Sequence, residues 1–300
     1  MLPNFLVVGA AKAGTTSLYH YLKQHPEIYM SPIKEPYFFS FVNQKPNFKG
    51  PFDEKVNEEI ITDLNDYKKL FANVTDEKSI GECSNSYLYL PESAVNIKRY
   101  IPKCKIIIIL RNPIERAYSH YMQSVMLDHD NLNFEDAIEK EKERLNLNWR
   151  WHYQYTGQSL YYEQVKRYLD LFGKNKVKIF LFEELKKGSV KIMQEVFSFL
   201  EVDNSFVPNI DIYNATGLPK NRILHKFLRH NNVIKNITRP ITPNGLRAKI
   251  FKFIESKNYS KKKISPIDIS TKKMLLNKFK NDILKLQELI HIDLSEWLKI

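Results

Sequence analysis

The most constraining feature of the sequence lies near its amino-terminal end, where an apolar run, a loop of small residues and a helical pattern follow one another without a break. The apolar run covers residues 5–8, and the spacing of Leu18, Tyr21 and Leu22 places these three side chains on one helical face. This order predicts a buried strand, a tight loop and a helix, which is the opening unit of an α/β fold.

The loop between strand and helix is suited to holding an anion. Backbone N–H groups can surround phosphate oxygens where side chains are small, as they are at Gly9, Ala10, Ala11, Ala13 and Gly14. Lys12 adds a positive charge, the helix beginning near Thr15 adds its dipole, and the hydroxyls of Thr15, Thr16 and Ser17 add donors. A simpler interpretation stays open, in which the loop is only a turn and Lys12 is solvated.

This loop differs from the common nucleotide-binding P-loop, which places a lysine directly after the second glycine of Gly-x4-Gly. Gly9 and Gly14 have that separation, but Thr15 stands at the lysine position and Lys12 lies inside the loop. The positive charge is therefore expected to come from the arch of the loop, and not from the first helical turn.

A second anion-binding group follows the clearest strand of the chain. Residues 105–110 are almost entirely isoleucine and leucine, which is typical of a parallel strand buried on both faces. Arg111 leaves the carboxyl end of this strand, Asn112 can cap the helix that Pro113 begins, and Ser119 lies about two turns along it. Because open α/β sheets bind ligands at this edge, we expect Arg111 and Ser119 to face the same cleft as Lys12.

The arginine also bears on the type of enzyme. A magnesium-dependent P-loop kinase or hydrolase wants an acid at the end of a central strand to hold the metal, whereas this strand ends in Arg-Asn. The sequence therefore favours an anion held by arginine without a metal ion. The kinase interpretation is kept as an alternative, since Glu183 and Glu184 follow another strand, although we interpret them as first-turn residues of the helix at 190–200.

Glu35 is the candidate general base. It lies between Lys34 and Pro36 in a proline-bounded segment, followed by Tyr37, Phe38 and Phe39, which we expect to anchor the segment against the core beside the anion loop. A carboxylate fixed in this way can act as a general base, which takes a proton from a reacting group of the substrate. The alternative is an ordinary surface acid paired with a lysine.

The sequence also predicts a substrate-binding cleft that is lined by aromatic side chains. We expect Tyr37, Phe38, Tyr87 and Trp151, with Phe39 and Trp149, to line a cleft for a small molecule, a glycolipid or a sugar. For the tryptophans and Tyr153, simple packing is the competing interpretation.

The remaining pattern completes an α/β fold with a P-loop-type parallel sheet flanked by helices and a basic helical C-terminal segment. Further strands are expected at residues 28–30, near 80 and at 177–182, and helices at 94–100, 134–147, 159–172, 190–200, 246–254 and 271–289. We predict one domain over residues 1–300, with an α/β core at 1–213 and a basic loop and helices at 214–300.

Positive charge is concentrated in this last part. The chain has a formal net charge of +12, but residues 220–280 hold 17 Lys and Arg against two acids, and the rest holds 29 against 32. Such a segment can steer an anionic cofactor or substrate toward a nearby site. A polyanion-binding module is the non-enzymatic alternative; specific nucleic-acid recognition is not expected, because aromatic residues do not alternate with the charges.

The cellular setting is indicated by what the 300 residues contain. Cys83 and Cys104 match no metal-ligand spacing and are too few for a disulfide framework, so we expect a reducing compartment. The sequence shows neither a signal-peptide pattern nor an apolar run of about 20 residues. We therefore expect a cytoplasmic protein without a transmembrane segment.

Taken together, three motifs resemble those of sulfotransferases that use 3′-phosphoadenosine-5′-phosphosulfate (PAPS), with the greatest likeness to bacterial members and to the heparan-sulfate branch. The motifs are Gly-Ala-Ala-Lys-Ala-Gly-Thr-Thr-Ser at residues 9–17, Lys-Glu-Pro-Tyr-Phe-Phe at 34–39 and Ile-Leu-Arg-Asn-Pro-Ile-Glu-Arg-Ala-Tyr-Ser at 109–119. They occur in the expected order. The helix around residues 160–165 and the end at 293–297 extend the likeness over most of the chain.

The resemblance implies a role for each motif. Lys12, Ala13, Gly14, Thr15, Thr16 and Ser17 match the cradle of the 5′-phosphosulfate, and Lys12 and Glu35 match the catalytic positions. Arg111 and Ser119 match the pair that binds the 3′-phosphate, which also remains on the product, 3′-phosphoadenosine-5′-phosphate (PAP). Lys220 and Arg222 fall in a segment similar to the one that covers the cofactor. By resemblance, the enzyme sulfates a hydroxyl or an amine without a metal.

Two departures narrow the resemblance. No histidine occurs between Pro26 and Ser119, which excludes the catalytic histidine of cytosolic aryl sulfotransferases and favours Glu35. Cys83 stands where the heparan-sulfate branch has a lysine, so a heparan-like acceptor is not implied.

Overall fold

The structure, a computed structural model, describes residues 1–210, 218–219, 259–260 and 266–300. Its centre is a five-stranded sheet in the order β2-β3-β1-β4-β5, in which every neighbouring pair is parallel. The strands are β1 (Phe5–Gly9), β2 (Ile28–Met30), β3 (Ser79–Cys83), β4 (Lys105–Leu110) and β5 (Val177–Leu181). The predicted α/β fold with a parallel sheet is confirmed.

The central strands are apolar because both faces of the sheet are covered. All residues of β1 are buried, as are Ile106 to Leu110 of β4. Gly81 of β3 lies in register with Phe5 of β1, and a Cβ at Gly81 would fall 2.0 Å from the Phe5 ring. A glycine is therefore required where that ring crosses the neighbouring strand.

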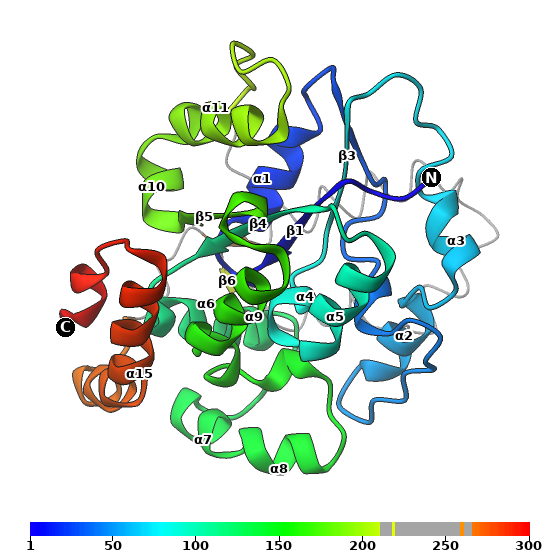
Figure 1. The fold of residues 1–300 in the computed structure, drawn as a ribbon. Helices are drawn as coiled ribbons and strands as arrows, with labels where there is room; N and C mark the ends of the chain where they lie inside the picture. Colours follow the sequence, from blue (N-terminus) through cyan, green and yellow to red (C-terminus); the bar gives the residue numbers. More distant parts are fainter. Residues whose placement is uncertain (211–217, 220–258, 261–265) are drawn as a thin grey trace. The chain divides into compact units, whose positions relative to one another are not determined.

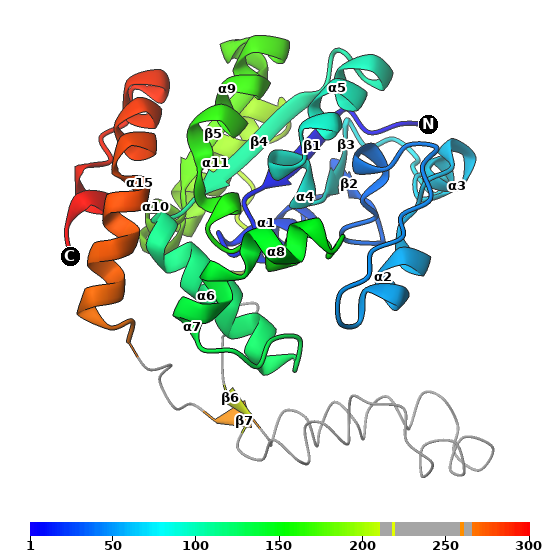
Figure 2. The same ribbon diagram turned by 90° about the horizontal axis from the view of Figure 1, so that it is seen from below.

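Helices cover the sheet on both sides (Figure 1). The helices α1 (Thr15–Leu22) and α11 (Ser189–Leu200) lie on one side, and α4 (Ser86–Tyr89), α5 (Pro91–Tyr100) and α9 (Tyr161–Phe172) on the other, as Figure 2 also shows. The helix α6 (Pro113–Met126) begins directly after β4. Since the strands are parallel, the segments that leave their carboxyl ends meet at one edge of the sheet.

Shorter helices occupy the connections. They are α2 (Asp53–Glu59), α3 (Leu64–Lys69), α7 (Phe134–Glu139), α8 (Glu141–Asn146), α10 (Phe182–Lys187) and the 3₁₀ turns Phe38–Ser40, Trp151–Tyr153, Gly157–Ser159, Lys174–Lys176 and Ser295–Leu298. Two helix predictions need correction. The helix expected at 134–147 is divided into α7 and α8, and Glu183 and Glu184 belong to the first turn of α10, separate from α11.

The long helix α15 (Ile269–Ile290) packs against α9, as the amphipathic pattern at 271–289 predicts. Asp282 of α15 accepts hydrogen bonds from the N–H groups of Tyr161 (2.7 Å) and Tyr162 (3.2 Å) at the start of α9. A side chain from one helix thus supplies acceptors for the unpaired first-turn N–H groups of another.

Two compact units are distinguished by the contacts between residues. One contains Met1–Tyr121, Leu132–Asn214 and Asp268–Ile300, and the other Met122–Asn131 and Ala215–Ile267, with a short antiparallel pair of β6 (Leu218–Pro219) and β7 (Tyr259–Ser260). Lys220, Arg222, the helix expected at 246–254 and the lysines at 261–263 lie outside the described residues. The predicted division at residue 213 stays a prediction. None of the helices in the described ranges is long and apolar enough to cross a membrane.

Candidate active site

The loop after β1 is fixed to the sheet by its backbone. The N–H of Ala10 donates to the carbonyl of Ile109 in β4 at 2.7 Å, and the N–H of Ala13 donates back to Ala10 at 3.2 Å. Gly14 has φ +91°, and a Cβ there would lie 3.1 Å from the ring of Phe182. The small residues that the sequence suggested for an anion loop are thus also needed for close packing.

Lys12 lies within this loop and is partly buried, with φ +68°. Burial, together with the positive charge of Arg111, lowers the pKa of Lys12 to about 8. Ala13 and Thr15 are buried, while Gly14, Thr16 and Ser17 remain partly exposed at the start of α1. An anion beside Lys12 would favour its charged form and would meet the positive end of α1.

Arg111 reaches the same loop. Its Nη1 donates to the carbonyl of Lys12 at 3.2 Å, its Nη2 donates to Glu115 Oε2 at 2.9 Å, and the guanidinium lies over the ring of Phe182. Its Nε is buried without a hydrogen-bond partner. The two cationic residues predicted to bind one nucleotide therefore lie next to each other.

Ser119 lies on the same face of α6 as Glu115, the ion-pair partner of Arg111. Arg111 binds Glu115, and Ser119 follows Glu115 by four residues, which is one helical turn. The cap predicted at Asn112 is confirmed, since its Oδ1 accepts from the N–H of Ile114 at 3.0 Å and of Glu115 at 3.3 Å.

Glu183 supports the same turn from α10. Its Oε1 accepts from the N–H of Asn112 at 3.1 Å, which links the ends of β4 and β5. The role that the structure shows for this acid is structural.

Glu35 is held by three donors. Lys34 Nζ binds Oε1, the hydroxyl of Tyr37 binds Oε2, and Asn85 Nδ2 donates to Oε1 at 2.9 Å. Burial alone would raise the pKa of Glu35, but the charge of Lys34 and the hydrogen bonds from Lys34 and Tyr37 outweigh burial and lower it. The carboxylate is thus charged at neutral pH and fixed in orientation.

A second carboxyl group lies behind this one. Glu82 has no exposed surface and accepts from Ser84 Oγ (2.6 Å), Tyr87 OH (2.7 Å) and Tyr67 OH (3.2 Å). Ser84 Oγ in turn accepts from the N–H of Tyr37 at 3.2 Å. Glu82 therefore supports the segment that carries Glu35.

The aromatic residues predicted to contact an acceptor fall into two groups. Phe38 and Tyr87 have no exposed surface, Phe38 stacking on Tyr67 and Tyr87 binding Glu82. Because a fully covered side chain cannot touch a ligand, we do not keep these two among the proposed acceptor contacts. Tyr37 is partly exposed and packs edge to face on Trp151 with ring centroids 5.2 Å apart, but Trp151 itself is 7% exposed.

The other aromatic predictions concern packing. Phe38 and Phe39 anchor the segment after Pro36 in the core, as expected. Trp149 packs on Tyr153 with centroids 4.8 Å apart, which agrees with the packing interpretation.

Sequence reasoning missed Arg116. It is the largest fully buried side chain of the described structure, and its Nη1 lies 3.5 Å from the carbonyl of Ala11 in the anion loop. The signal for it was its position within the third motif, five residues after Arg111. Asn85 and Lys34 were likewise not assigned to the site.

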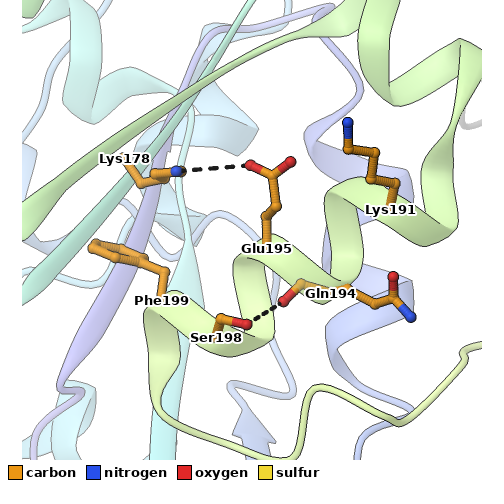
Figure 3. Close-up of a pocket in the computed structure, with 6 residues that line it drawn as sticks. All are labelled: Lys178, Lys191, Gln194, Glu195, Ser198 and Phe199. Atoms are coloured by element: carbon orange, nitrogen blue, oxygen red, sulfur yellow. Dashed lines mark hydrogen bonds and ion pairs between the residues drawn. The ribbon is translucent and has the colours of Figure 1, made fainter.

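A pocket of about 440 Å³ lies elsewhere, between β5 and α11 (Figure 3). It is lined by Lys178, Lys191, Gln194, Glu195, Ser198 and Phe199. None of these belongs to the predicted site, and Lys178 lies toward the amino end of β5, away from the loop edge. Over the described ranges, no cluster of three or more His, Cys, Asp or Glu is arranged to hold a metal ion.

Comparison with known proteins decides the family. The family model of the sulfotransferase domain matches residues 2–216, which is more than half of the chain. The chain belongs to the sulfotransferase family. Its class is therefore that of an enzyme transferring sulfuryl groups.

A solved sulfotransferase structure supports the assignment. The sulfotransferase of Alicyclobacillus acidocaldarius is 33% identical, with a TM-score of 0.78 and full coverage of both chains. The sulfotransferase domain from the curacin biosynthetic pathway shares the fold, with a TM-score of 0.51 at 13% identity.

Curated relatives are larger proteins. The bifunctional heparan sulfate N-deacetylase/N-sulfotransferase 4 of Mus musculus is 29% identical over 209 residues, covering 67% of this chain and 22% of that protein. Human carbohydrate sulfotransferase 15 is 28% identical over 151 residues, covering 40% and 27%. This chain thus spans about a quarter of the length of these two relatives.

Proposed function

We propose that this sulfotransferase moves the sulfuryl group of PAPS to a hydroxyl or amine, releasing PAP. The main support is that Lys12 and Glu35 lie close enough for the charge of each to shift the pKa of the other. Larger effects on these pKa values come from burial, from Arg111 at Lys12 and from Lys34 at Glu35. A cation for the leaving group and a carboxylate for the acceptor proton are what sulfuryl transfer needs.

The residues fit such a donor. The loop carries only small side chains around Lys12, the guanidinium of Arg111 lies against the loop at the carbonyl of Lys12, and the Nε of Arg111 is buried without a hydrogen-bond partner. We propose that Lys12, Ala13, Gly14, Thr15, Thr16 and Ser17 hold the 5′-phosphosulfate, and that Arg111 and Ser119 hold the 3′-phosphate. Lys220 and Arg222 remain proposed cofactor contacts from the sequence resemblance alone.

The donor supplies the sulfuryl group and a phosphate leaving group. Lys12 and the loop N–H groups stabilise the charge that develops on the leaving oxygen, an effect commonly of order 10²–10³ in rate for one preorganised donor. Glu35 takes the proton from the acceptor as its oxygen or nitrogen attacks sulfur, which contributes about 10²–10⁴. Lys34 and Asn85 keep the Glu35 carboxylate in place.

For the acceptor we propose a carbohydrate, a glycolipid or another small molecule that reaches Glu35 past Tyr37. The names of the heparan sulfate and carbohydrate relatives favour a sugar. Cys83, which stands where the heparan-sulfate branch has lysine, is buried and binds the carbonyl of Thr15, so it is not available to an acceptor. Cys83 and Cys104 are both unpaired, which fits the proposed cytoplasmic setting.

Calorimetric titration with PAP tests the donor. Wild-type protein should bind PAP, Lys12→Ala should weaken binding about 100-fold, and Lys23→Ala, an exposed lysine just after α1, should leave it unchanged. Absence of PAP binding by the wild-type protein would rule the proposal out, and magnesium-dependent ATP turnover would favour the kinase alternative.

Product analysis tests the reaction and the acceptor. The protein is incubated with PAPS and a panel of desulfated oligosaccharides, monosaccharides, glycolipids and phenols, and mass spectra are searched for the gain of one SO₃ group. We expect turnover to persist in EDTA, because the proposed site uses lysine and arginine for the charges that a metal would otherwise neutralise.

A further inference from the structure

Arg116 carries a buried charge to which the proposed reaction assigns no role. Its guanidinium donates from Nε to Ser159 Oγ at 2.6 Å, from Nη1 to His120 Nδ1 at 3.3 Å and to the Ala11 carbonyl at 3.5 Å, and from Nη2 to the Tyr155 carbonyl. Its exposed fraction is 0%. Acceptors on four different residues therefore fix the orientation of the Arg116 guanidinium.

None of these acceptors is charged. Two are backbone carbonyls and one is a hydroxyl. His120 must accept through Nδ1, since arginine has only donors, and burial lowers the pKa of His120 well below its usual value, so this ring is neutral. No ion pair of Arg116 with Asp or Glu occurs in the described part of the chain, and Glu141 influences it only from a distance.

A buried cation without an anion is unfavourable, and proteins keep one where a ligand or partner supplies the opposite charge. The charge of Arg116 lies against the anion loop. Arg116 binds the carbonyl of Ala11, and Arg111 binds the next carbonyl, that of Lys12. Because C=O and N–H of a trans peptide point in opposite directions, the N–H of Lys12 is directed away from Arg116.

We propose that Arg116 is a positioning residue for the donor nucleotide, which orients the Ala11–Lys12 peptide of the loop and places beneath it a fixed positive charge that the phosphosulfate compensates. This inference rests on the proposed function, because it takes the loop as the site of an anionic nucleotide. The residue acts through the loop without touching the ligand.

The first test is the affinity for PAP, measured by calorimetry on the full chain. Arg116→Met keeps the volume and removes the charge and all four hydrogen bonds, and it should raise the dissociation constant about 30- to 100-fold. Arg116→Lys keeps the charge without the guanidinium and should lose less. Ser159→Ala removes the acceptor of Nε, together with the hydrogen bond that the Ser159 hydroxyl donates to the Pro113 carbonyl, and it should lose about 3- to 10-fold.

A matched control is Arg99→Met. Arg99 is exposed near the end of α5, which leads to the amino end of β4 and thus to the edge of the sheet opposite the loop. Its PAP affinity should equal that of the wild type. Circular dichroism and thermal unfolding establish that each variant is folded.

The second test is the pH dependence of PAP binding, which a merely structural role would not move. Affinity should fall as Lys12 loses its proton near pH 8, since burial and the charges of Arg111, Arg116 and Lys34 lower the pKa of Lys12 while Glu35 opposes them. Without the charge of Arg116 this fall should move to higher pH in Arg116→Met. It should stay in place in Arg116→Lys and Arg99→Met.

The outcomes separate the two proposals. If the wild-type protein does not bind PAP, the proposed function and this inference both fail. If it binds PAP and folded Arg116→Met shows wild-type affinity with an unmoved pH profile, only the role of Arg116 is overturned. Should Arg116→Met not fold, wild-type affinity in both Arg116→Lys and Ser159→Ala overturns it instead.

Discussion

At the scale of single residues, the three donors around Glu35 determine how it can act as a base. Lys34 and Tyr37 bind different oxygens, and Asn85 shares Oε1 with Lys34. The hydrogen bonds favour the charged carboxylate, so the lowered pKa of Glu35 keeps it ready to accept a proton over a wide pH range. The same contacts lower the affinity of the carboxylate for a proton, so Glu35 is available as a base over a wide pH range but is a weaker base.

Tyr37→Phe should shift the acid limb of the kcat/KM profile to higher pH. Loss of the hydroxyl removes one hydrogen bond to Oε2, so the pKa of Glu35 rises and the base is protonated earlier as pH falls. Measuring kcat/KM for sulfuryl transfer between about pH 4 and about pH 8, a range that includes the usual pKa of glutamate, checks this shift. Tyr100→Phe, on a partly exposed tyrosine at the end of α5, is the control.

Glu35→Gln completes this test. It should reduce turnover about 10²- to 10⁴-fold while PAP affinity changes little. An acid limb that stays in place in Tyr37→Phe, together with retained turnover in Glu35→Gln, would remove Glu35 as the base.

Site residues could be found in the sequence when their chemistry was visible in a local motif. Lys12 stands among small residues and Arg111 follows an apolar strand, so both drew attention. Arg116 looks like any helical arginine, because burial of one face of α6 depends on residues far away, such as Ser159. Phe38 and Tyr87 were placed at a cleft because an aromatic residue suits a cleft and a core equally well, and only their partners Tyr67 and Glu82 decide between the two.

At the scale of elements, the strands were the most predictable part of the fold. Continuous apolar runs gave β2 and β4 with the correct ends, because parallel strands are buried on both faces. Helix limits were less accurate where caps are supplied by distant residues. The start of α9, for example, is satisfied by Asp282, which lies 121 residues away from Tyr161 in the sequence.

Asp282→Ala should destabilise the docking of α15 on α9. The substitution leaves the N–H groups of Tyr161 and Tyr162 without their acceptor, which costs about 1–2 kcal/mol when a helix cap is lost. Urea unfolding measures the change in the free energy of unfolding. Asp170→Ala, which removes only the exposed ion pair with Lys166 near the end of α9, should cost less than about 0.5 kcal/mol; equal losses for the two variants would contradict the capping role.

At the scale of the whole molecule, the order of the strands could not be read from the sequence. β1 lies between β3 and β4, which follow it by about 70 and 100 residues, and only long-range packing sets that order. The order matters for the site, because it brings the ends of β1, β3, β4 and β5 to one edge. The sheet, and not closeness along the chain, brings four ionisable residues together at this edge: Lys12, Glu82, Arg111 and Glu183.

Glu82 links this arrangement to the stability of the fold. Burial raises the pKa of Glu82 to about 7, although hydrogen bonds from Ser84, Tyr87 and Tyr67 oppose the shift. Between its ordinary pKa of 4.5 and about 7, the native state keeps a proton that the unfolded chain has released. Unfolding therefore releases a proton in this window, and the contribution of Glu82 to stability falls as pH rises through it.

Glu82→Gln should remove this dependence, since the amide does not titrate. The difference in the free energy of unfolding between wild type and variant should change in favour of the variant by up to about 3 kcal/mol as pH rises from 4.5 to 7, and then level off. Urea unfolding at several pH values measures it, with Glu92→Gln, an exposed acid at the start of α5, as the control. A difference that stays constant across this range would show that the carboxyl is charged in the folded protein throughout, and that the cluster of Tyr67, Ser84 and Tyr87 stabilises the anion fully.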